Sequence, residues 1–552
     1  MSPRNVNRNL GCGIAAGAVL LLAQSAAVAQ NNGLVQGVIY DAHGQPVAGA
    51  MVKLKHELRR LTFMVVSREQ GRFEAKDLPP GQYSVQAIGG DMRSPWFDAV
   101  YVNADGSANT KVSVALNYYR GPDLPAAWPQ RLPEEQVRLV SVDPKDLPEG
   151  YGKTLVAEKC TSCHDLRRVV VKRSNGDHWA HTTTRMRTRM TTANIPDLTD
   201  AEYDAIVNYL AGNFPEVQPY DANSRLPRTL LSGKAMSYRV VTYALTNPHA
   251  EPHDVAADPQ GNAWVSERAG KLGKFDPRAL TFTERDTPPG PAAKDRQSLG
   301  NPQIDSKGIL WVADGPNSRW LSYDTNTDRF LAFAFPRGKG NAGGNSMALH
   351  PDGTIWATGG GKEARQLYPE KVEFKFYEAP AAKTHRNPGA YGLAIAGDQS
   401  VWFAEDETDL MARVDPVTGK VDEYKIPYQG RAYPRRMNSD ANGDLWVALW
   451  NAGKLMKVDH KTKQMTLYTP PTATGGHYSV VVDKKQGYVW VSEHQVDKIA
   501  RFDPRTEEWV EFPLADAESD PRRIDIDPTN PNRIFFSGNI PGRVGFVEVL
   551  PQ

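Results

Sequence analysis

Hydrophobic and polar positions alternate in short runs along most of the chain, as they do in half-buried β-strands. From residue 237 onward the alternation becomes a repeat in which an aromatic residue returns every 44 to 47 positions. Each repeat has an apolar strand, an Asp-x-x-Gly-type turn, the aromatic residue and two further strands. Four strands repeated seven times predict a seven-bladed β-propeller over residues 237–552. The repeated aromatic residues are Trp264, Trp311, Trp356, Trp402, Trp446, Trp490 and Phe535.

The end of the repeat predicts how the propeller closes. The seventh repeat stops after its third strand, at residues 542–549, and lacks a fourth. An apolar alternating segment, Tyr238 to Tyr243, stands before the first repeat without partners of its own. We expect this segment to supply the missing strand of the last blade, which would leave no free sheet edge.

Residues 33–116 alternate with the same period of two, broken by a turn at residues 41–45. The order of strand, Asp-x-x-Gly turn, strand and then Leu-Pro-Pro-Gly-x-Tyr at 78–83 resembles the carboxypeptidase regulatory-like, transthyretin-like β-sandwich. The segment has no cluster of catalytic residue types. The resemblance implies a structural role, or adhesion to a partner or glycan.

Between the two β regions the period changes to that of helices. Residues 148–215 predict a short helix at 152–159, a second at 177–190 and a third at 198–210, with Thr199 as its N-cap. Proline-rich residues 117–147 and the segment 216–236 are expected to be linkers. The chain is thus predicted to be multidomain and mainly β, with one small all-α unit.

The helical segment contains the motif Cys160-Thr161-Ser162-Cys163-His164. This is the attachment signal of c-type haem, because two cysteines bond the porphyrin vinyl groups and the histidine ligates the iron. A redox Cys-x-x-Cys pair is the alternative, whereas zinc would need further ligands. The only other cysteine is Cys12. We therefore expect covalent haem c.

The segment resembles a small class I cytochrome c domain, which implies a sixth iron ligand before the last helix. Met190 is at that place, and Met186 lies one turn earlier. Ligation by His178 or His181, an open site, or simple core packing of the methionines are the alternatives.

Residues 1–29 read as a secretory signal, with Arg4 and Arg8 before an apolar stretch and a small-residue cleavage site at 27–29. The apolar stretch is too short for a membrane span. A periplasmic or secreted bacterial protein is therefore expected, as haem is attached after export. The 552 residues carry a net charge of +1 with mixed signs, which gives no reason to expect nucleic acid as a partner.

Over residues 238–549 the repeat resembles the streptogramin (virginiamycin B) lyase family of propellers. In that family carboxylates hold Mg²⁺ and a histidine is the base for ring-opening elimination of an ester. Glu251, His253 and Glu267 reproduce its Glu-x-His-x13-Glu arrangement, and His477 is a second candidate base. The chain departs from the family at Arg523, where the resemblance implies a histidine.

The repeat spacing places the start of each inner strand at the central channel. Of these residues, Tyr391, Arg436 and Arg523 are predicted to bind substrate, and the guanidinium of Arg523 suits a ligand with an anionic group. The full set comprises His253, Asn301, Ser346, Tyr391, Arg436, His477 and Arg523.

Three functions follow from these motifs. The first is electron transfer, in which the propeller binds or oxidises a small-molecule substrate or glycan and a redox partner protein takes electrons from the haem. The second is an Mg²⁺-dependent carbon–oxygen lyase of the streptogramin type. The third is a haem-bearing binding protein without catalysis. The haem motif favours the first, since an elimination has no redox step.

Overall fold

In two of the propeller repeats a turn carboxylate forms a hydrogen bond with the repeated tryptophan. The Asp258 carboxylate accepts the indole N–H of Trp264 at 2.9 Å and the backbone N–H of Asn262 at 2.8 Å. Asp440 binds the indole of Trp446 in the same way at 3.0 Å. A buried indole needs such a partner, so one carboxylate fixes both the hairpin and the packing of its tryptophan.

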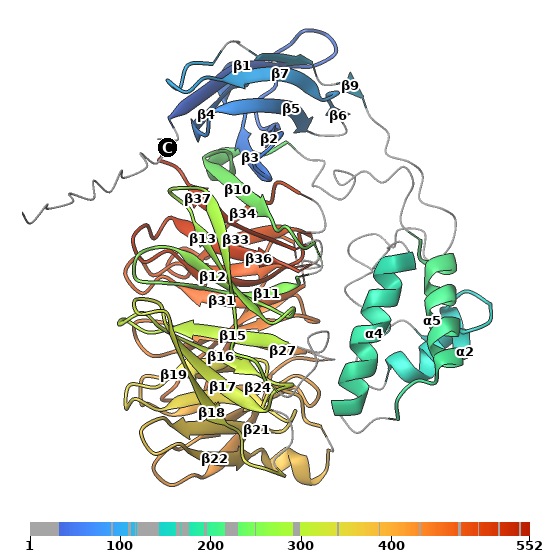
Figure 1. Ribbon diagram of the computed structural model, residues 1–552, viewed down its shortest axis with the longest axis vertical. Coiled ribbons are helices and arrows are strands. Elements are labelled where there is room, and N and C mark those ends of the chain that lie inside the picture. Colours follow the sequence, from blue (N-terminus) through green and yellow to red (C-terminus); the bar gives the residue numbers. More distant parts are fainter. Residues whose placement is uncertain are drawn as a thin grey trace, which may run out of the picture.

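The structure is a computed structural model (Figure 1). It describes residues 32–551 apart from 90–91, 109–111, 116, 119–142, 162–165, 167–175, 193–195, 216–229, 249, 291–297, 339–341, 386, 430–431, 473–475, 495, 517–518 and 540–541. The predicted signal segment lies outside the described residues.

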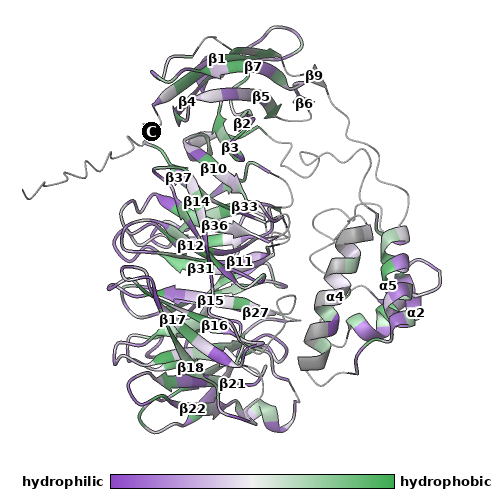
Figure 2. Ribbon diagram, in the orientation of Figure 1, coloured by the Kyte–Doolittle hydropathy of each residue, from purple (hydrophilic) through white to green (hydrophobic). Residues whose placement is uncertain are grey.

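Seven sheets form the propeller, and the innermost strands of neighbouring sheets contact one another in a closed ring. The predicted seven blades are therefore confirmed. Hydrophobic positions follow the strands, and hydrophilic positions are frequent in the connections (Figure 2). From the innermost strand outward, the first three blades are β11 (Pro252–Ala257), β12 (Ala263–Glu267), β13 (Lys271–Asp276), β14 (Thr281–Asp286); β15 (Leu299–Ile304), β16 (Ile309–Asp314), β17 (Arg319–Asp324), β18 (Arg329–Ala334); β19 (Met347–Leu349), β20 (Ile355–Gly359), β21 (Glu363–Tyr368), β22 (Glu373–Glu378).

The remaining four blades have the same antiparallel order. They are β23 (Ala390–Ile395), β24 (Val401–Glu405), β25 (Leu410–Val414), β26 (Val421–Lys425); β27 (Pro434–Ser439), β28 (Leu445–Leu449), β29 (Lys454–Val458), β30 (Met465–Tyr468); β31 (His477–Val482), β32 (Val489–Glu493), β33 (Lys498–Asp503), β34 (Glu508–Pro513); and β35 (Pro521–Ile526), β36 (Arg533–Gly538), β37 (Arg543–Val549) with β10 (Tyr238–Ala244).

Strand β10 completes the seventh blade as predicted. It pairs antiparallel with β37 from Tyr238 opposite Val549 to Ala244 opposite Arg543. The first segment of the repeat region thus closes the ring by hydrogen bonding to the last, and the two ends of the propeller hold one another.

The N-terminal domain is the predicted β-sandwich. One sheet has the order β4-β1-β8, and the other contains β3-β2-β5-β6-β9 with β7 paired to β5. Their strands are β1 (Gly33–Tyr40), β2 (Met51–His56), β3 (Leu61–Val66), β4 (Arg72–Leu78), β5 (Gly81–Gly89), β6 (Met92–Arg93), β7 (Phe97–Val102), β8 (Val112–Ala115) and β9 (Asn117–Tyr118).

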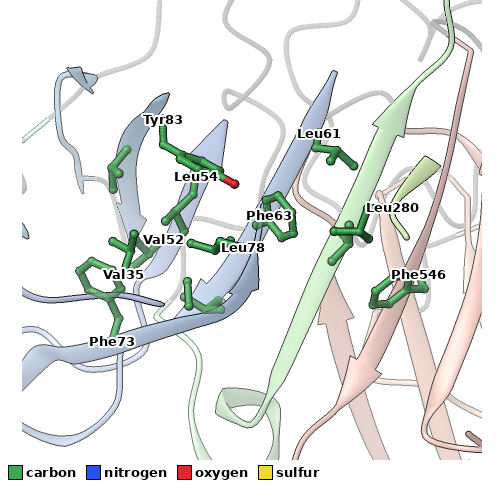
Figure 3. Close-up of a cluster of buried hydrophobic side chains, with 14 of the residues drawn as sticks. Val35, Val52, Leu54, Leu61, Phe63, Phe73, Leu78, Tyr83, Leu280 and Phe546 are labelled. Carbon is green, nitrogen blue, oxygen red and sulfur yellow. The ribbon is translucent and has the colours of Figure 1, made fainter. Parts of the chain in front are cut away.

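The sandwich and the seventh blade share one ten-stranded sheet, which the sequence did not indicate. Strand β3 pairs antiparallel with the outer edge of β10, from Val65 opposite Arg239 to Leu61 opposite Tyr243. One hydrophobic cluster continues across this seam, and Figure 3 shows Phe63 of the sandwich close to Phe546 of the propeller. The closing strand therefore has partners on both edges.

The helical unit has α2 (Lys153–Leu155), the π-helical turn η3 (Val156–Cys160), α4 (Gly176–Thr192) and α5 (Asp200–Asn213). All three predicted helices are present, and their ends differ from the expected ones by a few residues. The Thr199 hydroxyl and the Glu202 side chain form the predicted capping box at the start of α5. Within the described residues, no helix is long and apolar enough to span a membrane.

Short 3-10 helices connect several of these elements. They are η1 (Glu69–Gly71), η2 (Pro144–Asp146), η5 (Gly233–Met236) and η7 (Pro380–Lys383).

Candidate functional site

A ring of β-bulges surrounds one mouth of the propeller. In six of the seven innermost strands the pairing with the second strand shifts by one residue near the strand start. A bulge inserts an extra residue and re-aims its side chains, which is why bulges are frequent beside functional sites. The residues at the shifts are His253; Asn301 and Pro302; Tyr391 and Gly392; Arg435 and Arg436; Tyr478 and Ser479; Arg522 and Arg523.

Backbone strain accompanies these bulges. Glu251, Tyr433 and Asp520 each precede the proline that starts an innermost strand, and their φ angles are 46°, 55° and 47°. Non-glycine residues rarely adopt this left-handed region, and such strain concentrates at ligand sites. The same position on three blades is strained in the same way, so the mouth is built at a conformational cost.

Asp254 on β11 is the hub of the site. It forms an ion pair with Arg436 from β27, and it accepts the backbone N–H of Asn301 at 3.1 Å. Burial by itself raises the pKa of this carboxyl, but Arg436, His253 and Arg523 together hold it far below its usual range. Asp254 is thus a fixed negative charge between two arginines, and the residues that engage it come from strands β11, β15, β27 and β35.

His253 is buried and lies against the hub, with its Nδ1 atom 3.2 Å from Asp254 Oδ2. Burial lowers the pKa of His253 to about 3, and the positive charges of Arg268 and Arg522 act in the same direction against Asp254. The imidazole is therefore neutral at physiological pH. A proton on Nδ1 would be held by Asp254, and Nε2 would then be the acceptor.

Aromatic rings form the neighbouring part of the mouth. The hydroxyls of Tyr391 and Tyr478 are hydrogen bonded, although they come from the fourth and sixth blades. The guanidinium of Arg435 lies 4.1 Å from the ring centre of Tyr391 and 4.3 Å from that of Tyr433. An ion pair to Asp406 at 2.6 Å holds this guanidinium in place. The planar rings and the cation make a rigid wall.

A second ion pair supports the other side of Tyr478. Asp520 accepts from the Nε of Arg522 at 2.9 Å and also forms an ion pair with His494. The His494 ring stacks on Tyr478, with 5.3 Å between the ring centres. Tyr478 is thereby held from both faces, since the Arg522 guanidinium lies 5.5 Å from its ring centre.

Two of the carboxylates that follow the repeated tryptophans, Glu267 and Glu405, have acidic neighbours on the outer strands of their own blades. Burial raises the pKa of Glu267 to about 8, and the nearby charge of Glu284 on β14 adds to this shift. Burial also raises the pKa of Glu405 to about 8, with Glu423 on β26 as its acidic neighbour. Such buried groups are neutral acids near pH 7 rather than a ring of anions.

The structure gathers some of the predicted site residues and separates others. His253, Tyr391, Arg436 and Arg523 surround the hub or contact residues that do. His477 lies one residue before its bulge, fully buried, with Nε2 3.3 Å from Glu493 Oε1.

The predicted magnesium ligands have different neighbours. Glu251 lies near Arg268, with 3.7 Å between Oε2 and Nε, whereas the charges closest to Glu267 belong to β13 and β14. Across the described residues, no three His, Cys, Asp or Glu side chains are grouped closely enough to hold a metal ion. The Mg²⁺ site at Glu251 and Glu267 and the catalytic roles of His253 and His477 stay predictions.

Several site residues were missed because each is next to a predicted one. Asp254, Arg435, Tyr478 and Arg522 adjoin His253, Arg436, His477 and Arg523 in the sequence. Strict alternation sends neighbours to opposite faces of a strand, but a bulge lets both reach the mouth. A recurring polar pair at the strand starts was the available signal.

The candidate haem ligands lie in the helical unit. Met190 is 5% exposed and belongs to one hydrophobic cluster with Trp179 and Leu166, and Cys160 packs against that cluster. Helix η3 ends at Cys160, as the sequence predicted for the helix before the motif. Cys163 and His164 lie outside the described residues, whereas Met186 is half-buried on α4.

Comparisons with known proteins agree with the two β units. Residues 305–550 match the model of the virginiamycin B lyase family, and residues 35–117 match that of the carboxypeptidase regulatory-like domain. None of the curated proteins searched matches the chain.

Among solved structures, a catalytically inactive virginiamycin B lyase from Staphylococcus aureus with quinupristin is 18% identical, with a TM-score of 0.50. The alignment covers 57% of this chain and 100% of that one. A streptogramin B lyase is 19% identical over 58% of this chain and 100% of its own, also with a TM-score of 0.50. At such identities the likeness concerns the fold alone. The chain therefore contains a virginiamycin B lyase-like β-propeller and a carboxypeptidase regulatory-like domain.

Proposed function

We propose that this chain is an exported haem c protein that transfers electrons from a small-molecule substrate bound at the propeller mouth to a redox partner protein. The observation that carries the proposal is the Cys160-x-x-Cys163-His164 motif, placed directly after a helical segment whose hydrophobic cluster includes Met190. The periplasm or the outer cell surface suits this role, because haem is attached to such motifs after export.

The residues present fit the group. Cys160 and Cys163 would hold the porphyrin covalently, with His164 and Met190 as the two axial ligands of the iron. The group supplies one-electron transfer when bound. The apolar side chains around Met190, which include Trp179 and Leu210, exclude water from that side of the unit. Water exclusion and a thioether ligand both favour a raised potential.

The propeller mouth supports ligand binding better than elimination chemistry. A general base works best when its pKa is close to the working pH, and burial lowers that of His253 to about 3. Burial also raises the pKa of Glu267 to about 8, so this expected Mg²⁺ ligand is largely neutral near pH 7. In contrast, the mouth combines aromatic walls with fixed charges, as small-molecule sites do.

A streptogramin-type lyase is the second candidate, and one observation favours it. His253 Nδ1 is directed at Asp254, which leaves Nε2 as a proton acceptor on a propeller of the virginiamycin B lyase type. Incubation with quinupristin and Mg²⁺ tests this function. Ring opening by the parent and none by His253→Ala would establish it, and an intact depsipeptide in both would reject it.

Haem attachment is tested in protein purified from a host that exports and matures c-type cytochromes. The haem should stay with the polypeptide through acid–acetone extraction and a denaturing gel. Cys160→Ala should weaken this retention, whereas Cys12→Ala in the predicted signal segment is the matched control and should not. Complete extraction of haem from the parent would overturn the proposal.

The sixth ligand is tested by the ferric absorption spectrum, in which methionine ligation gives a weak far-red band. Met190→Ala should abolish the band, and Met186→Ala should keep it. The reverse result would transfer the role to Met186, and a band in neither parent nor variant would indicate a histidine or open site.

A further inference from the structure

Buried side-chain donors beside the hub lack hydrogen-bond partners. They include the Nδ2 of Asn301, which is 2% exposed, and the Nε of Arg436. The half-buried guanidinium of Arg523 makes no hydrogen bond or ion pair with the residues that the structure describes. Donors left without acceptors in a buried site are costly, so this group calls for a ligand that accepts hydrogen bonds.

These donors converge on one place. Strand β11, which carries Asp254, lies between β35 and β15, so Arg523 and Asn301 reach the hub from its two sides. Asn301 has a φ of 62°, and its backbone N–H is used by Asp254 while its amide group is not. The hub carboxylate is already engaged by Arg436, His253 and Asn301, which leaves the Arg523 guanidinium fork available to a ligand.

The charges at the mouth leave a positive surplus. Arg436, Arg522 and Arg523 face the carboxylates of Asp254 and Asp520, while His253 is neutral. The third carboxyl near Arg523 is that of Asp525, and burial raises its pKa, which disfavours its anion. Burial and the neighbouring charge of Arg436 lower the pKa of Arg523 to about 10, which means that its cation is disfavoured there. An added negative charge would relieve this repulsion and supply the missing acceptors.

We propose that the mouth binds an organic carboxylate, held between the Arg523 guanidinium and the Asn301 amide, with its apolar body against the half-buried ring of Tyr391. The proposal deepens the ligand-binding part of the proposed function and does not depend on the haem. A carboxylate matches the planar fork of a guanidinium with two parallel hydrogen bonds. The half-buried ring of Tyr391, held in place by the hydrogen bond of its hydroxyl to Tyr478, offers apolar surface to an aromatic or aliphatic body.

The full-length protein is titrated by calorimetry with benzoate, with benzamide and with inorganic phosphate at low salt. Benzamide has the shape of benzoate without its charge, and phosphate has charge without an apolar body. We expect benzoate to bind at least about tenfold more tightly than either, because hydrogen bonds to charged groups are the stronger ones. Equal binding of benzoate and benzamide, or no binding of benzoate, would overturn the proposal, and preferential binding of phosphate would reject the apolar part.

Variants locate the site. Arg523→Gln should weaken benzoate binding by about tenfold to a hundredfold, and Asn301→Asp, which keeps the size but replaces a donor by an acceptor, should abolish it. Arg329→Gln removes the same charge from the exposed surface of β18 and should change nothing. Melting temperatures check that each variant is folded. Unchanged affinity for benzoate in folded Arg523→Gln would contradict the proposal. A parent protein that holds no haem would refute electron transfer but would not affect the carboxylate site.

Discussion

The sandwich and the helical unit are joined to the propeller in opposite ways. The sandwich continues the seventh blade through strand pairing between β3 and β10, and the two share a hydrophobic cluster. The helical unit is built around a cluster of its own, in which the Trp179 indole donates to the backbone oxygen of Phe214 at 3.0 Å. Two units that share a sheet are expected to unfold together, whereas a unit with its own core can unfold independently.

This difference assigns different roles to two accessory units. A sandwich fused to the blade that closes the ring stabilises the closure, and it lies on the same rigid sheet as β35, which carries Arg522 and Arg523. Under the proposed function, a helical unit with its own core would exchange electrons with a partner without disturbing the propeller. The two units can be tested independently.

The largest effect is expected from deleting the sandwich. Without residues 33–118, β10 has a bare edge and the shared apolar cluster loses most of its buried residues. We expect insoluble protein or a melting temperature lower by at least about 10 °C. Deletion of residues 143–215 is the matched control, and the propeller should melt at the parent temperature in calorimetry. A stable propeller without its sandwich would contradict the shared-sheet interpretation.

Trp179→Ala should affect the helical unit alone. Removing a buried indole lowers the free energy of unfolding by about 3–5 kcal/mol. The thermal transition of the helical unit should therefore move to a lower temperature or disappear, while that of the propeller is unchanged. Far-UV circular dichroism of the helices and calorimetry of the whole chain separate the two. Trp179→Phe should give a smaller loss. A parallel shift of both transitions would show that the units fold together.

Lys53→Met tests the seam between the sandwich and the propeller. Lys53 is 4% exposed and pairs with Asp516 at 2.9 Å, and Asp516 keeps Arg543 at 3.2 Å. Breaking a buried ion pair lowers the free energy of unfolding by about 3 kcal/mol, and by slightly less when a second cation still pairs with the carboxylate. Lys76→Met, on an exposed pair with Glu74, should change the unfolding free energy by less than about 0.5 kcal/mol.

The effect of Lys53→Met should depend on pH in a definite direction. Burial raises the pKa of Asp516, but Lys53 and Arg543 hold it below its usual value. A lowered pKa contributes stability above the unfolded-state value of about 4, and this contribution is lost as the pH falls through the folded-state value. The difference in the free energy of unfolding between the parent and Lys53→Met, measured by urea titration, should become smaller in acid. A difference that becomes larger in acid would exclude the ion pair between Lys53 and Asp516 as the cause of the lost stability.

The smallest effect concerns the capping box of α5. Thr199→Ala removes the hydroxyl that accepts the Glu202 N–H at 3.2 Å and should cost about 1 kcal/mol in the helical transition alone. Thr199→Ser keeps the cap and should stay close to the parent. An equal loss in both variants would assign the effect to the lost methyl group.

The sequence predicted the elements whose signals are local. The repeat of Trp264 and its equivalents reports the hairpins directly, and Thr199 with Glu202 reports a helix start. The pairing of β3 with β10 joins segments about 175 positions apart. The alternation of apolar and polar residues within each strand does not predict which strand it pairs with. Within the site, the sequence predicted that His477 lies at the mouth, whereas the bulge places its neighbour Tyr478 there.

The bulge ring also bears on how such a mouth can change. Six blades each present adjacent residues there, while their tryptophans and turn carboxylates lie elsewhere in the blade. A substitution at the mouth can therefore alter the chemistry offered to a ligand without touching the tryptophan and turn carboxylate that hold the blade together. New specificities can be assembled one blade at a time, so that a common scaffold diversifies through many small and separately tolerated steps.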